Sequence, residues 1–289
     1  MRGVEPARQR HWDWRAAANF IGGGSAAGLF CFAAVASHEQ GSWLLRAAPL
    51  APMLVLVGLF CVATELGRPL RAGNVFRRWR TSWMSREAIA VATFLPAAVA
   101  AVVLRSPTVA WLAALLGLAL LYCQARMLKA ARGIPAWREP AIVPLIFATG
   151  LVEGGGMFVI LSAAFGAVPG AALLGLFALI AARLLAWGSY QARVAIPGAA
   201  PRRTVVILEE IRLPLEIAGH LLPLGLLVIA LVANSPIAAS GGAVLALAAG
   251  WYLKLTLVTR AAYDQGFAIA RAPARSPGYS HAGAKPGWA

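Results

Sequence analysis

The chain has 289 residues, of which 60% are hydrophobic and 13% charged, and its mean hydropathy is +0.71. A soluble globular domain carries about 25% charged residues, so this composition excludes that class of protein. The net charge of +15 would suit a nucleic-acid-binding protein, but in so apolar a chain it favours membrane topology and contact with anionic lipids instead.

Eight apolar runs follow one another along the chain. Each is near the length of about 20 residues that crosses a bilayer core as a helix, whereas a β-barrel would show alternating segments of about 10 residues. The chain is therefore predicted to be an all-α polytopic membrane protein with eight transmembrane helices, which we expect to form two four-helix groups. The predicted spans are 16–37, 48–65, 87–104, 108–127, 141–165, 168–190, 215–232 and 238–258.

Glycines gather in the first and fifth spans, namely Gly22, Gly23, Gly24 and Gly28, and Gly154, Gly155 and Gly156. Small residues let membrane helices approach closely, so these glycines predict tight helix contacts; the alternative is room for a flat ligand. After the last span, residues 272–289 are rich in Pro, Gly and Ala. They are predicted to be a flexible C-terminal tail, which leaves a transmembrane domain over residues 1–271.

The basic residues lie almost wholly in alternate connections. They occupy the N-terminal tail, the second, fourth and sixth connections, and a C-terminal end counted from Lys254. Under the positive-inside rule, this bias places both termini and all the long connections in the cytoplasm. We expect a multi-pass protein of a bacterial inner membrane.

The connection from Glu65 to Glu87 holds six arginines between its two carboxylates: Arg68, Arg71, Arg77, Arg78, Arg80 and Arg86. In the simpler interpretation, Glu65 pairs with Arg68 or Arg71, and Glu87 is a first-turn carboxylate that the helix dipole favours. In the alternative, both carboxylates take protons from a quinone headgroup or hydrogen-bond to it. Quinone chemistry moves two protons with two electrons, so it needs a titratable group beside an apolar slot.

Further ionisable residues fall inside or near the later spans. Glu153 is costly within a membrane unless it is paired or faces a cavity, and Arg183 is its predicted partner. Glu216 and His220 are four residues apart and therefore share a helix face. Structural pairing and a proton path through Glu153, Arg183, Glu216 and His220 are both compatible with the sequence.

Histidine and cysteine usage bears on redox centres. Of the four histidines only His220 lies inside a predicted span, so a bis-histidine haem is not expected. Cys31, Cys61 and Cys123 lie in apolar runs without a CxxC pair, so they indicate packing residues rather than an iron–sulfur or other metal site. Electrons would therefore have to arrive from a partner protein.

Four segments carry a resemblance to a known family. The segment GRPLRAGNVFRRWRTSWMSREA (67–88) resembles the loop after the second span in membrane anchors of the dimethyl sulfoxide reductase type, within the wider polysulfide reductase (NrfD-like) group. HWDWRAAANFIGGGSAAGLF (11–30) resembles the first span of these anchors. Arg132 to Pro140 and Arg260 to Gly266 are similar to the fourth connection and to the end of the last span.

The resemblance implies a haem-free anchor subunit of a molybdopterin oxidoreductase. Such a subunit docks an iron–sulfur subunit, which leads to a molybdopterin or tungstopterin catalytic subunit, and exchanges electrons with the quinone pool (menaquinone or ubiquinone). It is not catalytic alone. Quinone-site positions of the family map onto Glu65, Arg68, Pro69, Arg71, Ser82, Trp83, Ser85 and Glu87, although some members have a His at the position of Glu65. The predicted docking residues are Arg77, Arg78, Arg80, Arg132, Trp137 and Arg138.

Two other functions fit eight spans and a buried Glu153. One is a secondary transporter, against which stands the absence of paired discontinuous helices in two matching halves. The other is a related subunit that also translocates protons. The sequence does not indicate the substrate of the catalytic partner or the direction of electron flow.

Overall fold

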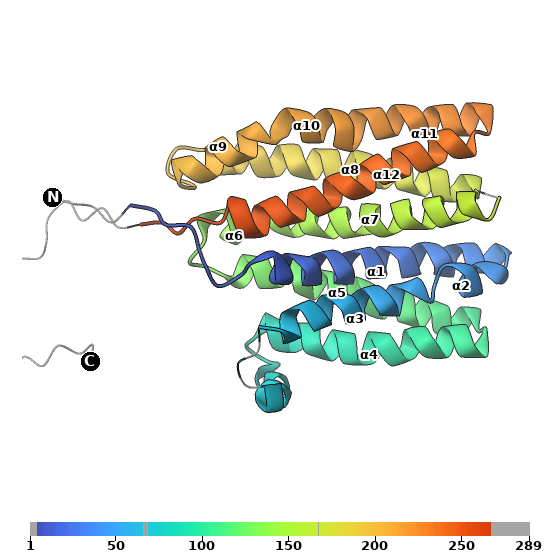
Figure 1. Cartoon of the computed structure of the whole chain (residues 1–289), viewed down its shortest axis with the longest axis horizontal. Helices are drawn as coiled ribbons and strands as arrows, with labels where there is room; N and C mark the ends of the chain where they lie inside the picture. The colour runs from blue at the N-terminus through green and yellow to red at the C-terminus, as the bar shows by residue number, and fades with distance from the viewer. Residues whose placement is uncertain (1–4, 66, 68, 167, 267–289) are drawn as a thin grey trace, which may run out of the picture.

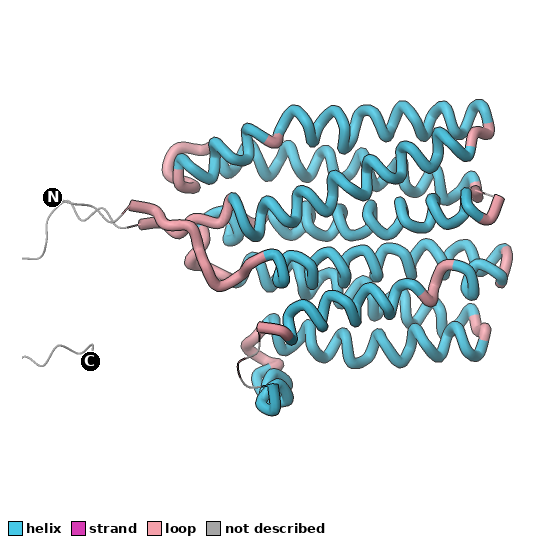
Figure 2. Tube along the Cα trace, viewed as in Figure 1, coloured by secondary structure: helices cyan, strands magenta, loops and turns pink. Residues whose placement is uncertain are grey.

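The computed structural model describes residues 5–65, 67, 69–166 and 168–266, and the predicted boundary at residue 271 lies outside this part of the chain. Among the described residues, eight helices are long and apolar enough to cross a membrane, which confirms the all-α polytopic prediction (Figures 1 and 2). The spans are α1 (Trp14–Glu39), α2 and α3 (Ser42–Arg46, Leu50–Ala63), α4 (Trp83–Leu104), α5 (Pro107–Ala130), α7 (Ile142–Ala164), α8 (Gly170–Val194), α10, η2 and α11 (Arg212–Glu216, Ile217–Leu221, Leu222–Ala233), and α12 with η3 (Pro236–Leu255, Thr256–Arg260).

The eight spans form the two predicted groups of four. In Figure 1, α1, α3, α4 and α5 make up the lower half of the bundle and α7, α8, α11 and α12 the upper half. Helix α1 joins the halves, because it packs against α3 and α5 on one side and against α7 and α12 on the other. Its central position explains why this span is largely buried within the chain, whereas α4 and α8 leave most of their surface to lipid.

Close approach of α1 and α7 accounts for the glycines of both spans. A Cβ atom built on Gly154 would overlap the backbone of Gly28 and Leu29, and one built on Gly28 would lie 2.5 Å from Gly150 O. Backbone therefore fills the space beside these two glycines. The prediction of tight packing is confirmed at this contact, and no room for a flat ligand remains there.

Two of the tight turns between spans use the same local chemistry. In Arg105-Ser106-Pro107 and Asn234-Ser235-Pro236, the first residue ends a helix in the left-handed region, with φ of 50° and 48°. The serine hydroxyl then accepts a hydrogen bond from the backbone N–H three residues later, that of Val109 or Ala238. Proline occupies the first helical position, where a backbone N–H would have no partner within the helix.

The second span begins earlier than predicted. The predicted start at residue 48 treated Arg46 as part of a polar loop, whereas α2 already includes it. The Arg46 guanidinium lies 5.4 Å from the centres of the Trp43 and Phe165 rings, which gives this cation an aromatic environment at the membrane edge. A short break at residues 47–49, ending in Pro49, then precedes α3.

The long connections and the described parts of both terminal segments lie at the same end of the bundle, on the left in Figure 1. We call this the basic end; of the described residues it comprises 5–13, 64, 65, 67, 69–82, 131–141, 195–211 and 261–266. It carries η1 (Pro69–Arg78), α6 (Pro135–Arg138) and α9 (Arg202–Glu210). One part of the charge assignment was wrong: Lys254 is fully buried within the last span rather than in a terminal connection.

The end of the last span ties the basic end together. Its π-helical turn η3 and the residues after it offer backbone carbonyls that other segments bind. Trp137 Nε1 of α6 donates to Leu257 O at 2.9 Å, and Thr204 Oγ1 of α9 donates to Ala261 O at 2.9 Å. Gln9 of the N-terminal strap (residues 5–13) donates its Nε2 to Val258 O and its backbone N–H to Ala262 O. Carbonyls that lack a partner at this helix end thus accept hydrogen bonds from the strap, α6 and α9, and so hold these three segments in place.

Candidate functional site

A buried carboxylate lies near the basic end, between α1, α4 and α5. Glu87 is 7% exposed, and its Oε1 accepts hydrogen bonds from Asn19 Nδ2 at 2.9 Å and from Gln124 Nε2 at 3.0 Å. Gln124 Nε2 also donates to Asn19 O at 3.0 Å. Within the described part of the chain, the recorded bonds reach Oε1 alone, so Oε2 is left to take a proton or the hydroxyl of a ligand.

Glycine on α1 makes room for this cluster. A Cβ atom on Gly23 would overlap the amide of Gln124, so a larger residue there would displace the side chain that holds Glu87. On the other side of α1, Gly58 of α3 packs against Asn19, with a built Cβ 3.0 Å from Asn19 Cα. Close helix contacts at Gly23 and Gly58 therefore fix the positions of Gln124 and Asn19, the two partners of Glu87.

Two arginines lie over the ring of Trp83, which is one turn before Glu87. The Arg86 and Arg126 guanidinium carbons lie 4.2 and 4.5 Å from its ring centre, a distance at which cation–π attraction is favourable. Ser82 caps α4 by accepting the N–H of Ser85, and Ser85 itself is buried. Four of the predicted site residues thus lie together at the start of α4: Ser82, Trp83, Ser85 and Glu87.

Glu65 belongs to a second acidic cluster at the start of α1. Its Oε1 lies 3.0 Å from Arg15 Nε, and Arg15 also pairs with Asp13 at 2.8 Å. Hydrogen bonds from Arg15 lower the pKa of Asp13 to about 2, whereas burial and the neighbouring Asp13 raise the pKa of Glu65 above its ordinary value. Glu65 is therefore the carboxyl of this cluster that more readily holds a proton.

The remaining quinone-site predictions lie in η1 or just before it. Arg68 is outside the described residues. Pro69 and Arg71 are in η1, and only their backbone is described. Among the described side chains, Glu65 pairs with Arg15 of α1; the predicted partners Arg68 and Arg71 are not among those side chains.

A third cluster, which is fully buried, lies deeper in the bundle between α1, α7 and α12. Glu153 and Lys254 are both fully buried and form an ion pair of 2.6 Å. Ser25 Oγ donates to the same Glu153 oxygen at 3.0 Å, and Lys254 Nζ also donates to Phe20 O at 2.9 Å. The predicted pairing of Glu153 with Arg183 was wrong, because Lys254 lies inside the span and reaches the carboxylate first.

Arg183 is instead bound by a helical irregularity. It donates to Gly219 O at 2.6 Å, to Ala246 O at 2.8 Å and to His220 Nε2 at 3.1 Å. His220 Nδ1 lies 2.8 Å from Leu215 O, which can only accept a hydrogen bond, so Nδ1 carries the ring proton. His220 Nε2 is therefore the acceptor for Arg183. Gly219 and His220 lie in the π-helical turn η2, a feature often found at functional sites.

The four residues predicted as a proton path fall into separate sets. Glu153 binds Lys254, Arg183 binds His220, and Glu216 pairs with Arg212 at 3.1 Å on a partly exposed face. Among the described residues, no recorded hydrogen bond links these sets. Sharing a helix face did not bring Glu216 and His220 together.

The predicted docking residues divide by exposure. Arg77, Arg78, Arg80, Arg132 and Arg138 are exposed at the basic end. Trp137 is only 3% exposed, stacks on Trp12 at 5.0 Å between ring centres and donates to Leu257 O. It therefore holds α6 in place and offers a partner no surface.

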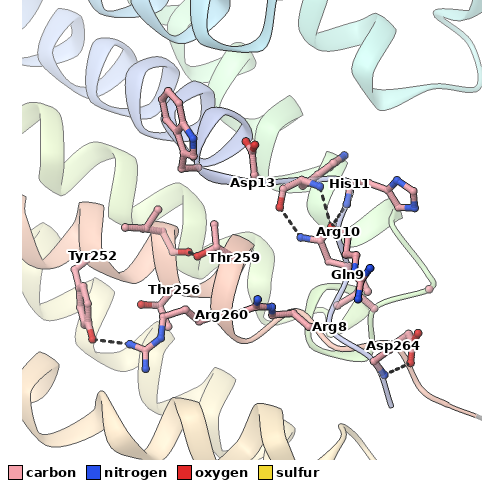
Figure 3. A pocket seen from close by; sticks show the side chains of 16 residues that line it. Arg8, Gln9, Arg10, His11, Asp13, Tyr252, Thr256, Thr259, Arg260 and Asp264 are labelled. Carbon is pink, nitrogen blue, oxygen red and sulfur yellow. Dashed lines mark hydrogen bonds between the residues drawn. The ribbon is translucent and has the colours of Figure 1, made fainter. Parts of the chain in front are cut away.

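A hollow of about 1000 Å³ opens at the basic end between the N-terminal strap and the end of α12 (Figure 3). Its walls include Trp14 and Tyr252, which are 60% and 42% exposed, and its lining reaches Asp13 of the Glu65 cluster. Thr256 also lines it, with a buried Oγ1 that has no partner among the described residues. Its volume is at the upper end of the range of about 300–1000 Å³ that is usual for ligand pockets. Across the described residues, no group of three or more His, Cys, Asp or Glu is placed to hold a metal ion.

Several residues of these clusters were missed from the sequence. Asn19, Gln124 and Ser25 are small polar side chains inside apolar runs, and Lys254 was counted as a loop charge. A signal was present, since each is a polar residue at membrane depth. Which carboxylate each of them binds depends on helix packing.

Comparison with known proteins adds one finding. A family model described as DMSO reductase anchor subunit (DmsC) matches residues 13–206, about two thirds of the chain. This region includes Glu65 and Glu87 and their partners Arg15, Asn19 and Gln124. No curated protein matches the chain.

Proposed function

Because the chain belongs to the family of DMSO reductase anchor subunits, we propose that it exchanges electrons and protons with membrane quinone on behalf of a partner reductase. As a multi-pass membrane protein of this family, it is an anchor subunit of a DMSO reductase-type complex. The proposed partners are an iron–sulfur subunit and, through it, a molybdopterin or tungstopterin catalytic subunit. They would dock on the basic end, at the cytoplasmic face of a bacterial inner membrane. Family membership favours this function over a secondary transporter.

One observation supports the quinone site above the others. Two carboxylates, Glu65 at the basic end and Glu87 in the first turns of α4 beside it, contact Arg15 and Asn19, which are four residues apart and share one face of α1. Two proton-accepting groups from different segments thereby lie beside successive turns of α1. The hollow described above is lined by Asp13, which shares Arg15 with Glu65, and would serve as the approach to this outer carboxylate.

The chemistry assigned to these residues is proton transfer and orientation. Glu87 would accept a proton at Oε2 while Asn19 and Gln124 hold Oε1 in place. Glu65 would serve as the outer acceptor, and its raised pKa suits reversible protonation near neutral pH better than an ordinary glutamate does. Electrons would pass to or from the iron–sulfur subunit at the same end of the bundle.

The test compares quinol-linked turnover of the intact complex with turnover driven by an artificial electron donor that reaches the partner subunits directly. We expect Glu87→Gln to lower quinol-linked turnover about 100-fold, the scale of a lost proton-transfer group, and to leave donor-driven turnover unchanged. Glu209→Gln changes an exposed carboxylate at the same end and should affect neither rate. Full quinol-linked activity in Glu87→Gln would refute the assignment.

A further inference from the structure

A second hollow at the basic end, of about 820 Å³, is unusually rich in positive charge. It lies between the start of α4, the last turns of α5, the following turn and α6. Four cations line it: Arg126, Lys129, Arg132 and Arg138. The lining contains one carboxylate, that of Glu139.

Within the described part of the chain, these four cations have no carboxylate paired with them. Among the described residues, none of the four forms an ion pair, and Glu139 is already within 3.8 Å of Arg193. Arg126 uses Nη1 on the Tyr122 hydroxyl at 2.8 Å, but its buried Nε has no hydrogen-bond partner. Gathering like charges costs free energy, so the arrangement favours a negatively charged occupant.

The shape of the lining indicates what kind of anion would fit. An anionic phospholipid would need an apolar wall for its chains, yet no large hydrophobic side chain of this lining is among the exposed ones. Arg132 and Arg138 are exposed at the end of the bundle, where a protein outside the membrane would approach. Arginine binds carboxylates with paired, charge-assisted hydrogen bonds.

The hollow also adjoins the carboxylate cluster described above. Trp83 is part of its lining, and Arg126 lies over the Trp83 ring at 4.5 Å. Glu87 follows Trp83 by one helical turn. Whatever fills the hollow is therefore in contact with the start of the helix that carries Glu87.

We propose that this four-cation hollow receives an acidic segment of the electron-transfer subunit and so fixes where that subunit sits over the Glu87 cluster. The inference rests on the proposed function, because it requires that such a partner exists. Carboxylates of the segment would bind Arg132 and Arg138 at the rim and Arg126 within, and the positive field would speed association at low salt.

Co-purification of the complex from native membranes tests the proposal. We expect Arg132→Glu/Arg138→Glu to reduce the retained iron–sulfur subunit about tenfold or more at about 150 mM salt. The matched control is Arg202→Glu/Arg203→Glu, which makes the same charge change on exposed residues of α9 at the same end. It should retain the partner.

The outcomes separate this inference from the proposed function. If the unmodified chain retains no iron–sulfur subunit, the proposed function itself fails. If it does and the Arg132/Arg138 variant retains as much, or if both variants lose it equally, the hollow is not the docking site. A photo-crosslinking residue at Lys129 should attach to an acidic stretch of the partner; attachment to phospholipid instead would overturn the proposal.

Discussion

Among the described residues, the buried ionisable side chains Glu153, Glu87 and Arg183 are each stabilised by different partners. Glu153 is paired with a cation, whereas Glu87 is held by two amides without one. Arg183 has no carboxylate in hydrogen-bond contact among the described residues and relies on two backbone carbonyls and a neutral histidine. A carboxylate bound only by amides exchanges a proton more easily than one tied to an ammonium group. This difference is why we assign proton transfer to Glu87 and packing to Glu153.

The Glu153–Lys254 pair yields a prediction of stability. Lys254→Met removes one partner and leaves a buried carboxylate uncompensated, so it should destabilise the protein by about 3–5 kcal/mol. Glu153→Gln/Lys254→Met replaces both charges and should recover most of that loss. Thermal unfolding in mild detergent would measure both variants.

If the double variant is as unstable as Lys254→Met alone, the pair does more than neutralise charge. The control is Arg212→Gln, which breaks an exposed ion pair with Glu216 and should change stability by less than about 1 kcal/mol.

At this scale, sequence reasoning identified the carboxylates better than their partners. Glu87 and Glu153 stand out because a charge in or next to an apolar run is costly. Asn19, Gln124 and Lys254 are equally visible as polar residues, but the helices that bring them to a carboxylate are far apart in sequence. For Glu216 the predicted partner was wrong. It is one helical turn from His220, but its side chain lies on a partly exposed face and pairs with Arg212 instead.

At the scale of elements, α1 organises the molecule. Its face toward α4 and α5 carries Asn19 and Gly23, while Gly24 and Ser25 face the Glu153–Lys254 pair. Both clusters therefore depend on the placement of one helix, and that placement depends on the contact between α1 and α7.

That contact predicts a sharp difference between two glycines. Gly154→Ala would place a methyl group within the backbone of α1, so we expect a loss of at least about 1–3 kcal/mol or failure to fold. Gly188→Ala in α8 meets nothing within 4 Å and should be neutral or slightly stabilising, because alanine favours helix. Yield and thermal stability of the purified chain measure both. Equal behaviour of the two variants would contradict the packing described.

At the π-helical turn η2, the sequence indicates an unpaired backbone carbonyl but not the side chain that binds it. Pro223 has no N–H, so Gly219 O lacks its usual α-helical donor, and Arg183 supplies one from α8. A proline within a span predicts a free carbonyl four residues earlier. The residue that would occupy it lies in another helix, beyond what local pattern reveals.

For the whole molecule, hydropathy predicted the eight spans, because apolar length is a local property. The two groups of four were expected from the number of spans, and which helices form each group depends on packing. The side on which each connection lies followed from the basic residues, and the structure gathers those connections at one end. Which side of a membrane that end faces is still a prediction.

Cysteine labelling would measure it. Gly41, Gly73 and Gly133 have open space where a Cβ would lie, so Gly→Cys at each should not disturb the fold. In intact cells, a reagent that does not cross the membrane should label Gly41→Cys and leave Gly73→Cys and Gly133→Cys unlabelled until the cells are opened. The reverse pattern would place the basic end outside. Replacing Cys31, Cys61 and Cys123 with alanine removes background reaction.

The carbonyls at the end of the last span have a consequence for biogenesis. The strap at residues 5–13, α6 and α9 are all synthesised before the residues around η3 that hold them. The basic end is therefore completed only when the final span has been inserted. A chain stalled before that point would present an unfinished surface, so we expect recruitment of a partner to report on complete synthesis of the anchor.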